Sequence, residues 1–175
     1  MFRRSSSNGL RVMQRWVGAR GVHTEERLQK MGIELPTPRT PQASFVLTVR
    51  TGNLLYTAGH IPIKPDGTIT VGKVGQELTE EEAIEAARNV AIQLMGTIKR
   101  DLGDLDRVKR VVKLLGFVNC VDGFTAQPKV VNGASDLFAE VFQEKGVHAR
   151  SAVGTNALPR NVPVEIEAII EIEED

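Results

Sequence analysis

Arg150 and a row of glutamates are the residues of this sequence whose types and spacing could do chemistry. Arg150 lies in an apolar stretch at residues 149–155, and a second apolar stretch follows at 164–170. A guanidinium group stays charged and presents paired donors that match a carboxylate, so Arg150 is a natural anchor for an anionic small molecule. Alternation along the second stretch and the residue after it puts three acids on one face, namely Glu165, Glu167 and Glu171. This face is either exposed to water, with Arg150 in an ordinary salt bridge, or it lines a polar cleft.

Strands are the elements that must position these side chains. Alternating or continuous apolar runs predict five of them, at residues 45–50, 54–58, 107–119, 149–155 and 164–170. The tight turn at 51–53 joins the first two into a β-hairpin. The apolar density of residues 107–119 predicts an interior, buried strand.

Two helices complete the predicted fold. The first begins after Thr79, where Glu82 three residues later completes a capping box, and a second runs over about 127–145. The acids at 101–106 lack the ligand pattern of a calcium loop and are interpreted as turn and cap residues. The order β-β-α-β-α-β-β predicts an α+β fold with a mixed sheet and both helices on one face. Apolar residues on the other face, Phe45, Leu47 and Val49, predict oligomerisation through it.

Composition excludes several classes of protein. A chain of 175 residues fits one domain, and its 22 acidic and 22 basic residues leave no net charge to attract nucleic acid or a membrane. The single cysteine, Cys120, excludes an internal disulfide and is interpreted as a core residue. The three histidines are scattered, which argues against a metal site, and His148 is interpreted as a surface or interface residue. No apolar run reaches the length of a membrane span.

Residues 1–30 differ from the rest of the chain. They carry arginines and serines and no acid before Glu25, a composition typical of a mitochondrial transit peptide, with a disordered basic tail as the alternative. The folded domain is then expected over residues 31–175, starting at Met31, and a start at Thr24 is the alternative. The expected location is the mitochondrial matrix if the leader is a transit peptide, and the cytoplasm otherwise.

A family resemblance is carried by four short segments in order along the chain. They are residues 52–62 (GNLLYTAGHIP), 149–151 (ARS), 158–159 (LP) and 164–168 (VEIEA). Together they resemble the RidA/YjgF family of reactive-intermediate deaminases, also called L-PSP endoribonuclease or translation-inhibitor proteins, from about Pro36 onward. The resemblance implies a chorismate-mutase-like fold and a homotrimer with clefts between neighbouring subunits. It also implies hydrolysis of 2-imino acids and their enamine tautomers to 2-oxo acids and ammonia, without a cofactor.

The resemblance also implies roles for individual residues. It makes Arg150 the carboxylate-binding residue and Glu165 the residue that positions or activates the attacking water. Gly59, with the backbone of residues 58–61, falls on the loop that shapes the pocket. His60 stands where relatives often have glutamine, beside the pocket. The asparagine of the second helix corresponds to Asn132, or is replaced by Ser135.

Three positions in the implied pocket lack the polar group of the family's deaminases. Phe45 replaces a tyrosine, Ala58 a serine and Ala152 a cysteine. Imine hydrolysis needs a clamped carboxylate, a proton or hydrogen bond for the nitrogen, and an activated water, and these losses remove donors for the nitrogen. The resemblance makes a RidA-like deaminase the expected function, and the missing donors leave two alternatives. One is a trimer that binds or senses a small carboxylate without chemistry, and the other is an L-PSP-type endoribonuclease, against which the charge balance argues.

Overall fold

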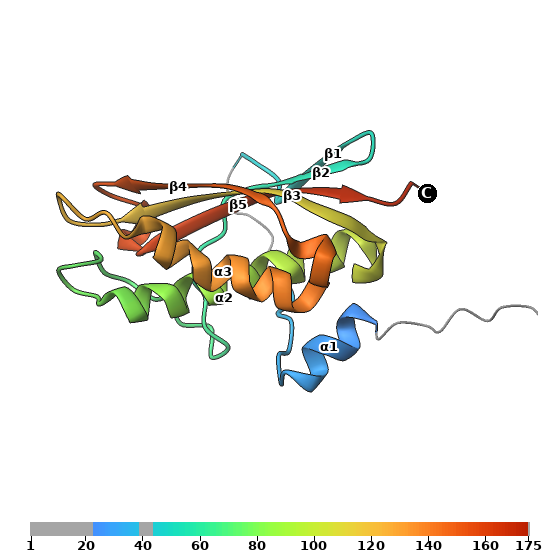
Figure 1. Ribbon diagram of the computed structural model, residues 1–175, viewed down its shortest axis with the longest axis horizontal. Coiled ribbons are helices and arrows are strands. Elements are labelled where there is room, and N and C mark those ends of the chain that lie inside the picture. Colours follow the sequence, from blue (N-terminus) through green and yellow to red (C-terminus); the bar gives the residue numbers. More distant parts are fainter. Residues whose placement is uncertain (1–22, 39–43, 175) are drawn as a thin grey trace, which may run out of the picture.

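A five-stranded sheet with two long helices on one side organises the chain (Figure 1). The computed structural model describes residues 23–38 and 44–174. Its strands are β1 (Thr48–Thr51), β2 (Leu54–Thr57), β3 (Val108–Asn119), β4 (Ala149–Thr155) and β5 (Val164–Ile172). Its α-helices are α1 (Thr24–Lys30), α2 (Glu80–Leu102) and α3 (Gln127–Phe142), and short 3₁₀ turns lie at Leu105–Arg107, Gln143–Gly146 and Pro159–Asn161. The predicted order of strands and helices is confirmed, with α1 added before it.

The sheet has the strand order β1-β2-β5-β3-β4. Neighbouring strands are antiparallel except β3 and β4, which are parallel, so the sheet is mixed as predicted. β3 lies inside the sheet between β5 and β4, which agrees with its apolar sequence. β1 begins at Thr48, later than predicted, and one further backbone hydrogen bond, from the Ala58 N–H to the Leu47 carbonyl at 2.8 Å, joins the chain just before β1 to the chain just after β2.

The two faces of the sheet are chemically different. Every second residue of β5 from Val164 to Ile172 is buried, and these residues face α2, while α3 packs on β3 and β4. The helices in turn pack closely on each other: a Cβ atom at Gly133 of α3 would lie 2.0 Å from the carbonyl oxygen of Ile84 in α2. The capping box of Thr79 and Glu82 at the start of α2 is confirmed. α3 ends at Phe142, three residues earlier than predicted, and a 3₁₀ turn continues it to Gly146.

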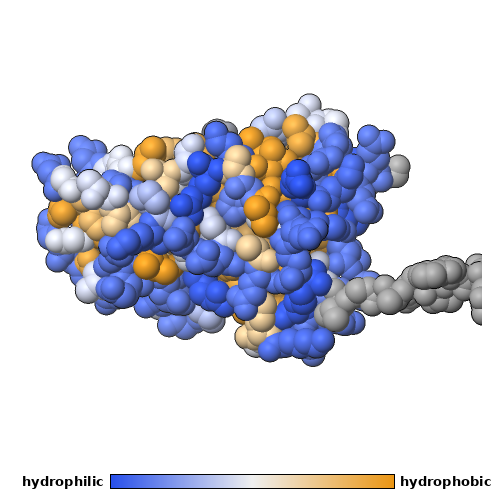
Figure 2. Space-filling view, in the orientation of Figure 1, coloured by the Kyte–Doolittle hydropathy of each residue, from blue (hydrophilic) through white to orange (hydrophobic). Residues whose placement is uncertain are grey.

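Apolar side chains remain uncovered on the face opposite the helices. Val49, Tyr56 and Val153 are 58, 40 and 44% exposed, and pairing across the strands places Val49 beside Tyr56 on this face. Phe45 is 54% exposed and precedes β1. On the side seen in Figure 2, apolar side chains form separate patches among hydrophilic ones. In the described part of the chain, no helix is long and apolar enough to cross a membrane.

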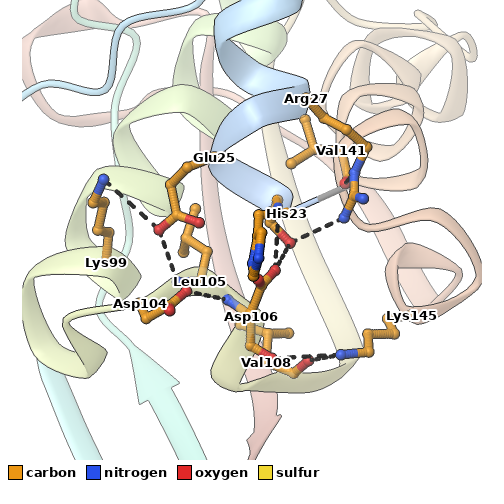
Figure 3. A network of polar contacts seen from close by, with 11 residues as sticks. His23, Glu25, Arg27, Lys99, Asp104, Leu105, Asp106, Val108, Val141 and Lys145 are labelled. Carbon is orange, nitrogen blue, oxygen red and sulfur yellow. Dashed lines mark hydrogen bonds and ion pairs between the residues drawn. The ribbon is translucent and has the colours of Figure 1, made fainter. Parts of the chain in front are cut away.

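Helix α1 was not predicted, and it belongs to the folded unit. Leu28 is 2% exposed in the core. The Thr24 backbone N–H and hydroxyl donate to Asp106 at 2.9 and 2.6 Å, and His23 also contacts this carboxylate (Figure 3). Glu25 accepts from the Leu105 backbone N–H at 3.0 Å, as Figure 3 also shows. The folded unit therefore includes residues from Thr24 onward, the earlier of the two starts considered.

The Asp106 contacts make the docking of α1 sensitive to acid. Burial would raise the pKa of the Asp106 carboxyl, but the hydrogen bonds from Thr24 and the contact with His23 outweigh it and lower that pKa from 3.8 to about 2. A depressed pKa contributes stability that is present above pH 3.8 and is lost as the pH falls through about 2. The contact with Asp106 also raises the pKa of His23. The stability that protonated His23 contributes is therefore present below pH 6.5 and is lost as the pH rises through the raised pKa.

We expect Asp106→Asn to release α1 without unfolding the sheet. Loss of a charged acceptor should lower the free energy of unfolding by about 1 kcal/mol at neutral pH and speed amide exchange in α1, measured by urea unfolding and hydrogen–deuterium exchange. In this variant the free energy of unfolding should fall less between pH 3.8 and about pH 2 than it does in the wild type. Asp122→Asn, on an exposed loop before α3, is the matched control. Equal acid sensitivity in wild type and Asp106→Asn would contradict this role.

Candidate active site

Arg150 is held on α3 by three hydrogen bonds. It pairs with the buried Leu114 of β3, so its side chain leaves β4 on the helix-covered face. Nη1 donates to Asn132 Oδ1 at 2.8 Å and to Ser135 Oγ at 2.9 Å, and Nη2 donates to the Pro128 carbonyl at 3.1 Å. Asn132 and Ser135, which the sequence left as alternatives, therefore both contact the arginine. They lie three residues apart on α3 and so share one side of the helix.

The guanidinium group keeps donors for a ligand. It has five N–H groups, and the three bonds above use both of Nη1 and one of Nη2. The Nε–H and the second N–H of Nη2 have no partner among the described residues. Arg150 is thus fixed in place by α3 and can still make a two-pronged contact with a carboxylate.

Glu165 is a half-buried carboxylate on the other face of the sheet. It pairs with Phe117 of β3, and Phe117 pairs with the exposed Val153. The structure shows no hydrogen bond or ion pair of the Glu165 side chain with the described residues. Burial, with a smaller contribution from the charge of Glu167, raises the pKa of the Glu165 carboxyl. A carboxylate with a raised pKa and no partner is a stronger base than an exposed one and is available for proton transfer.

Gly59 leaves the space that the Glu165 carboxyl group occupies. A Cβ atom at position 59 would lie 2.0 Å from Glu165 Oε1 and 2.8 Å from its carboxyl carbon. The backbone at residue 59 and the carboxyl group therefore approach each other closely only because this residue is glycine.

We expect Gly59→Ala to displace the Glu165 carboxyl group while the fold is kept, because only the end of a flexible side chain must move. A shift of about 1 Å at a catalytic group can lower the rate by about 100-fold. The measurement is the turnover of a 2-imino acid, with a thermal melt as the control for folding. Unchanged turnover in a correctly folded Gly59→Ala protein would show that the site does not depend on glycine at position 59.

The predicted site residues form two separate groups within one chain. Arg150 and Asn132 make up the first, and Glu165 and Gly59 the second. In β5, Glu165 lies on the face opposite to Ala168, and Ala168 shares the helix-covered face with Leu114 and Arg150. Arg150 and Glu165 therefore point to opposite sides of the sheet and do not meet in one chain.

The other predicted residues are placed as follows. His60 is buried and faces α2: its Nε2 contacts the Thr97 hydroxyl and its Nδ1 the Ala58 carbonyl, both at 2.8 Å. Burial lowers the pKa of His60. Ala152 pairs with Gly116 and packs against the core. The structure thus brings His60 toward the helix core rather than toward Glu165.

No signal in the sequence pointed to the Pro128 carbonyl as a partner of Arg150, because any residue supplies a carbonyl. Among the described residues, one group of carboxylates is close enough to share a cation, formed by Glu25, Asp104 and Asp106. Backbone amides or side chains of the chain itself already occupy these carboxylates, so they are docking contacts of α1.

A family model described as "YjgF/chorismate_mutase-like, putative endoribonuclease" matches residues 25–171. The chain belongs to this family. The match begins within α1 and ends within β5, so it covers both groups of site residues. The predicted family and chorismate-mutase-like fold are confirmed.

This chain is similar to three members of the compared proteins to different degrees. Protein TCP17 of Trypanosoma cruzi is 45% identical over 146 residues, which cover 83% of this chain and 91% of the relative. The crystal structure of Atu1372 from Agrobacterium tumefaciens is 43% identical, with a TM-score of 0.80 and coverage of 86 and 92%. The YjgF gene product from E. coli is 25% identical, with a TM-score of 0.56 and coverage of 79 and 94%. The backbone of this chain is therefore more similar to that of Atu1372 than to that of E. coli YjgF.

Proposed function

We propose that this YjgF-family protein hydrolyses reactive 2-imino acids and their enamine tautomers to 2-oxo acids and ammonia. The observation that carries the proposal is an arginine fixed by α3 with two N–H groups left for a carboxylate. Family membership agrees with it, as does the half-buried Glu165, whose side chain has no polar partner among the described residues. The reaction needs no cofactor, because water and acid–base groups suffice for hydrolysis of a C=N bond.

We propose further that the site forms between chains of a homotrimer. Arg150 and Glu165 point to opposite sides of the sheet within one chain, so a ligand can reach both only if they come from neighbouring chains. The uncovered Val49, Tyr56 and Val153 supply apolar surface for such an interface. Arg150 of one chain would then face Glu165 of the next across a cleft.

In this arrangement each residue has one task. Arg150 holds the carboxylate of the 2-imino acid and so fixes the adjacent C=N carbon. Glu165 removes a proton from water as the water oxygen bonds to that carbon, and this proton passes to the nitrogen, which gives a carbinolamine. Glu165 then moves the hydroxyl proton of the carbinolamine to the nitrogen as the C–N bond breaks, so that ammonia leaves and the 2-oxo acid is released. Raising the pKa of Glu165 makes it a better base for the first step.

Two other functions remain as alternatives. Phe45, Ala58 and Ala152 make the expected pocket poorer in hydrogen-bond donors than the family's deaminases, which favours a trimer that binds or senses a small carboxylate without chemistry. The family description favours an endoribonuclease. The equal numbers of acidic and basic residues supply no general attraction for the phosphates of RNA, so we place this function last.

The deciding experiment is an imine hydrolysis assay. An amino-acid oxidase generates 2-iminobutanoate or 2-iminopropanoate in the presence of the full chain, and ammonia or 2-oxo acid release is followed. Acceleration over the spontaneous rate supports the deaminase. No acceleration, with binding of 2-oxobutanoate, supports the carboxylate-binding alternative. Cleavage of RNA in the absence of both would support the endoribonuclease.

We also propose a mitochondrial matrix location. It rests on the basic, serine-containing composition of residues 1–22, which lie outside the described residues. The test is the N-terminal sequence of the protein isolated from its own cells. A mature N-terminus still at Met1 would rule out processing of a transit peptide.

A further inference from the structure

We infer that His148 is a positioning residue that couples the binding of a carboxylate at Arg150 to the uptake of a proton. The inference rests on the carboxylate-binding role of Arg150 in the proposed function. It assigns to His148 a task in the site, whereas its position in the sequence indicated only a surface or interface residue.

A single hydroxyl group, that of Ser135, contacts both Arg150 and His148. Ser135 Oγ lies 2.9 Å from Arg150 Nη1 and 3.0 Å from His148 Nε2. His148 Nδ1 lies 2.6 Å from the carbonyl oxygen of Gly146, which can only accept, so Nδ1 carries a hydrogen. In the neutral ring Nε2 is then an acceptor, and the Ser135 hydroxyl must donate to it. The Ser135 oxygen is thereby free to accept the N–H of Arg150.

These groups line an accessible hollow. It has a volume of about 440 Å³ and is lined by Ser135, Asp136, Ala139, Gly146, Val147, His148 and Arg150. Its charged and titratable groups are His148 and Arg150 from the β4 side and Asp136 from α3. Behind His148 lies the edge-on ring of Phe138, at 6.3 Å between ring centres, which holds the imidazole in place. A ligand that contacts Arg150 thus lies close to the Ser135 hydroxyl.

Protonation of His148 would change what this hydroxyl can do. Both ring nitrogens of an imidazolium donate, so Nε2–H would donate to Ser135 Oγ, which has two lone pairs and can still accept from Arg150. The Ser135 hydrogen would then be released from His148 and could donate to a group in the hollow. The site would gain a hydroxyl donor beside Arg150, where Phe45, Ala58 and Ala152 provide none.

The charge on Arg150 determines the direction of the coupling. Burial, and then the positive charge of Arg150, lower the pKa of His148. A carboxylate bound at Arg150 would offset that charge and let the pKa of His148 rise. By linkage, the carboxylate must then bind more tightly as the pH falls through the His148 pKa.

Two measurements test the inference, with 2-oxobutanoate as the probe. The first is the pKa of His148, followed by NMR of the histidine rings and assigned with His148→Gln. It should rise in Arg150→Gln, and it should rise in the wild type when 2-oxobutanoate is bound. Ser135→Ala should keep the pKa of His148 sensitive to the charge of Arg150 but should weaken 2-oxobutanoate binding. A His148 pKa that stays the same in Arg150→Gln and in the 2-oxobutanoate complex would overturn the inference.

The second measurement is the affinity for 2-oxobutanoate between pH 8 and pH 5.5. Wild-type affinity should increase by about threefold more than that of His148→Gln over this range. Comparison with His148→Gln is needed because Glu165, whose pKa is raised, also takes up a proton at low pH. Its protonation favours binding of an anion in both proteins equally. His23→Gln, at an exposed histidine far from the hollow in sequence, is the matched control. Equal pH dependence in wild type and His148→Gln would overturn the inference, whereas no binding at any pH would overturn the proposed function itself.

Discussion

Arg150→Gln is expected to lower kcat/KM for 2-iminobutanoate by about 100-fold and to abolish measurable binding of 2-oxobutanoate. The substitution removes the positive charge and the two N–H groups that remain after Arg150 has bonded to α3. Hydrogen bonds to a charged partner contribute about 1.5–3 kcal/mol, which corresponds to about 10- to 150-fold in affinity or rate. The turnover assay and calorimetric titration of 2-oxobutanoate measure the two effects.

The matched control for this prediction is Arg88→Gln. Arg88 lies on α2 and forms a long ion pair of 4.0 Å with Glu140, so its loss should leave turnover unchanged. Arg150→Gln must also keep its fold, because the arginine bonds to Asn132, Ser135 and Pro128, and a thermal melt checks this. A folded Arg150→Gln protein with wild-type activity would show that the carboxylate binds elsewhere.

Glu165→Gln is expected to lower kcat by about 100- to 10,000-fold while 2-oxobutanoate still binds. The amide has nearly the shape of the carboxyl group but cannot remove a proton from water. The Glu165 side chain has no hydrogen-bond partner among the described residues, so the substitution breaks no hydrogen bond of the described fold. Loss of turnover together with retained binding identifies a base, whereas loss of both would indicate that Glu165 only shapes the pocket. Glu173→Gln, at an exposed carboxylate just after β5, is the control.

The two inactive variants together test whether the site lies between chains. In a trimer assembled from equal amounts of Arg150→Gln and Glu165→Gln chains, a site is intact when one chain supplies Arg150 and its neighbour supplies Glu165. Random assembly makes about one quarter of the sites intact, so co-expression should restore about one quarter of wild-type activity. If mass spectrometry shows trimers that contain both variants but activity is not restored, both residues belong to one site of a single chain. A monomeric mass for the wild type would overturn the trimer.

Local sequence signals were sufficient for most of the elements. The capping box at Thr79 and Glu82 places the start of α2, because both partners lie within one turn of the helix. Alternation along β5 correctly separated the buried residues from the glutamates, since a strand turns each successive side chain to the opposite face. The family resemblance, now confirmed, identified Arg150 and Glu165 as the residues to examine.

Features that depend on distant residues could not be predicted in this way. α1 is only seven residues long, too short for a periodic signal, and its contacts reach Asp106 more than eighty residues away. The orientation of His60 toward Thr97 depends on how α2 packs on the sheet.

The sequence by itself determined the fold class, the family and the two candidate residues, because these depend on local periodicity and on short motifs. Only the tertiary structure showed that Arg150 and Glu165 lie on opposite faces of the sheet, since that depends on the register of β4 and β5 with β3. It also showed that Arg150, Ser135 and His148 share hydrogen bonds, which require α3 to lie across β4. A hydrogen bond depends on atoms approaching to about 3 Å, and for residues on different elements only packing brings this about.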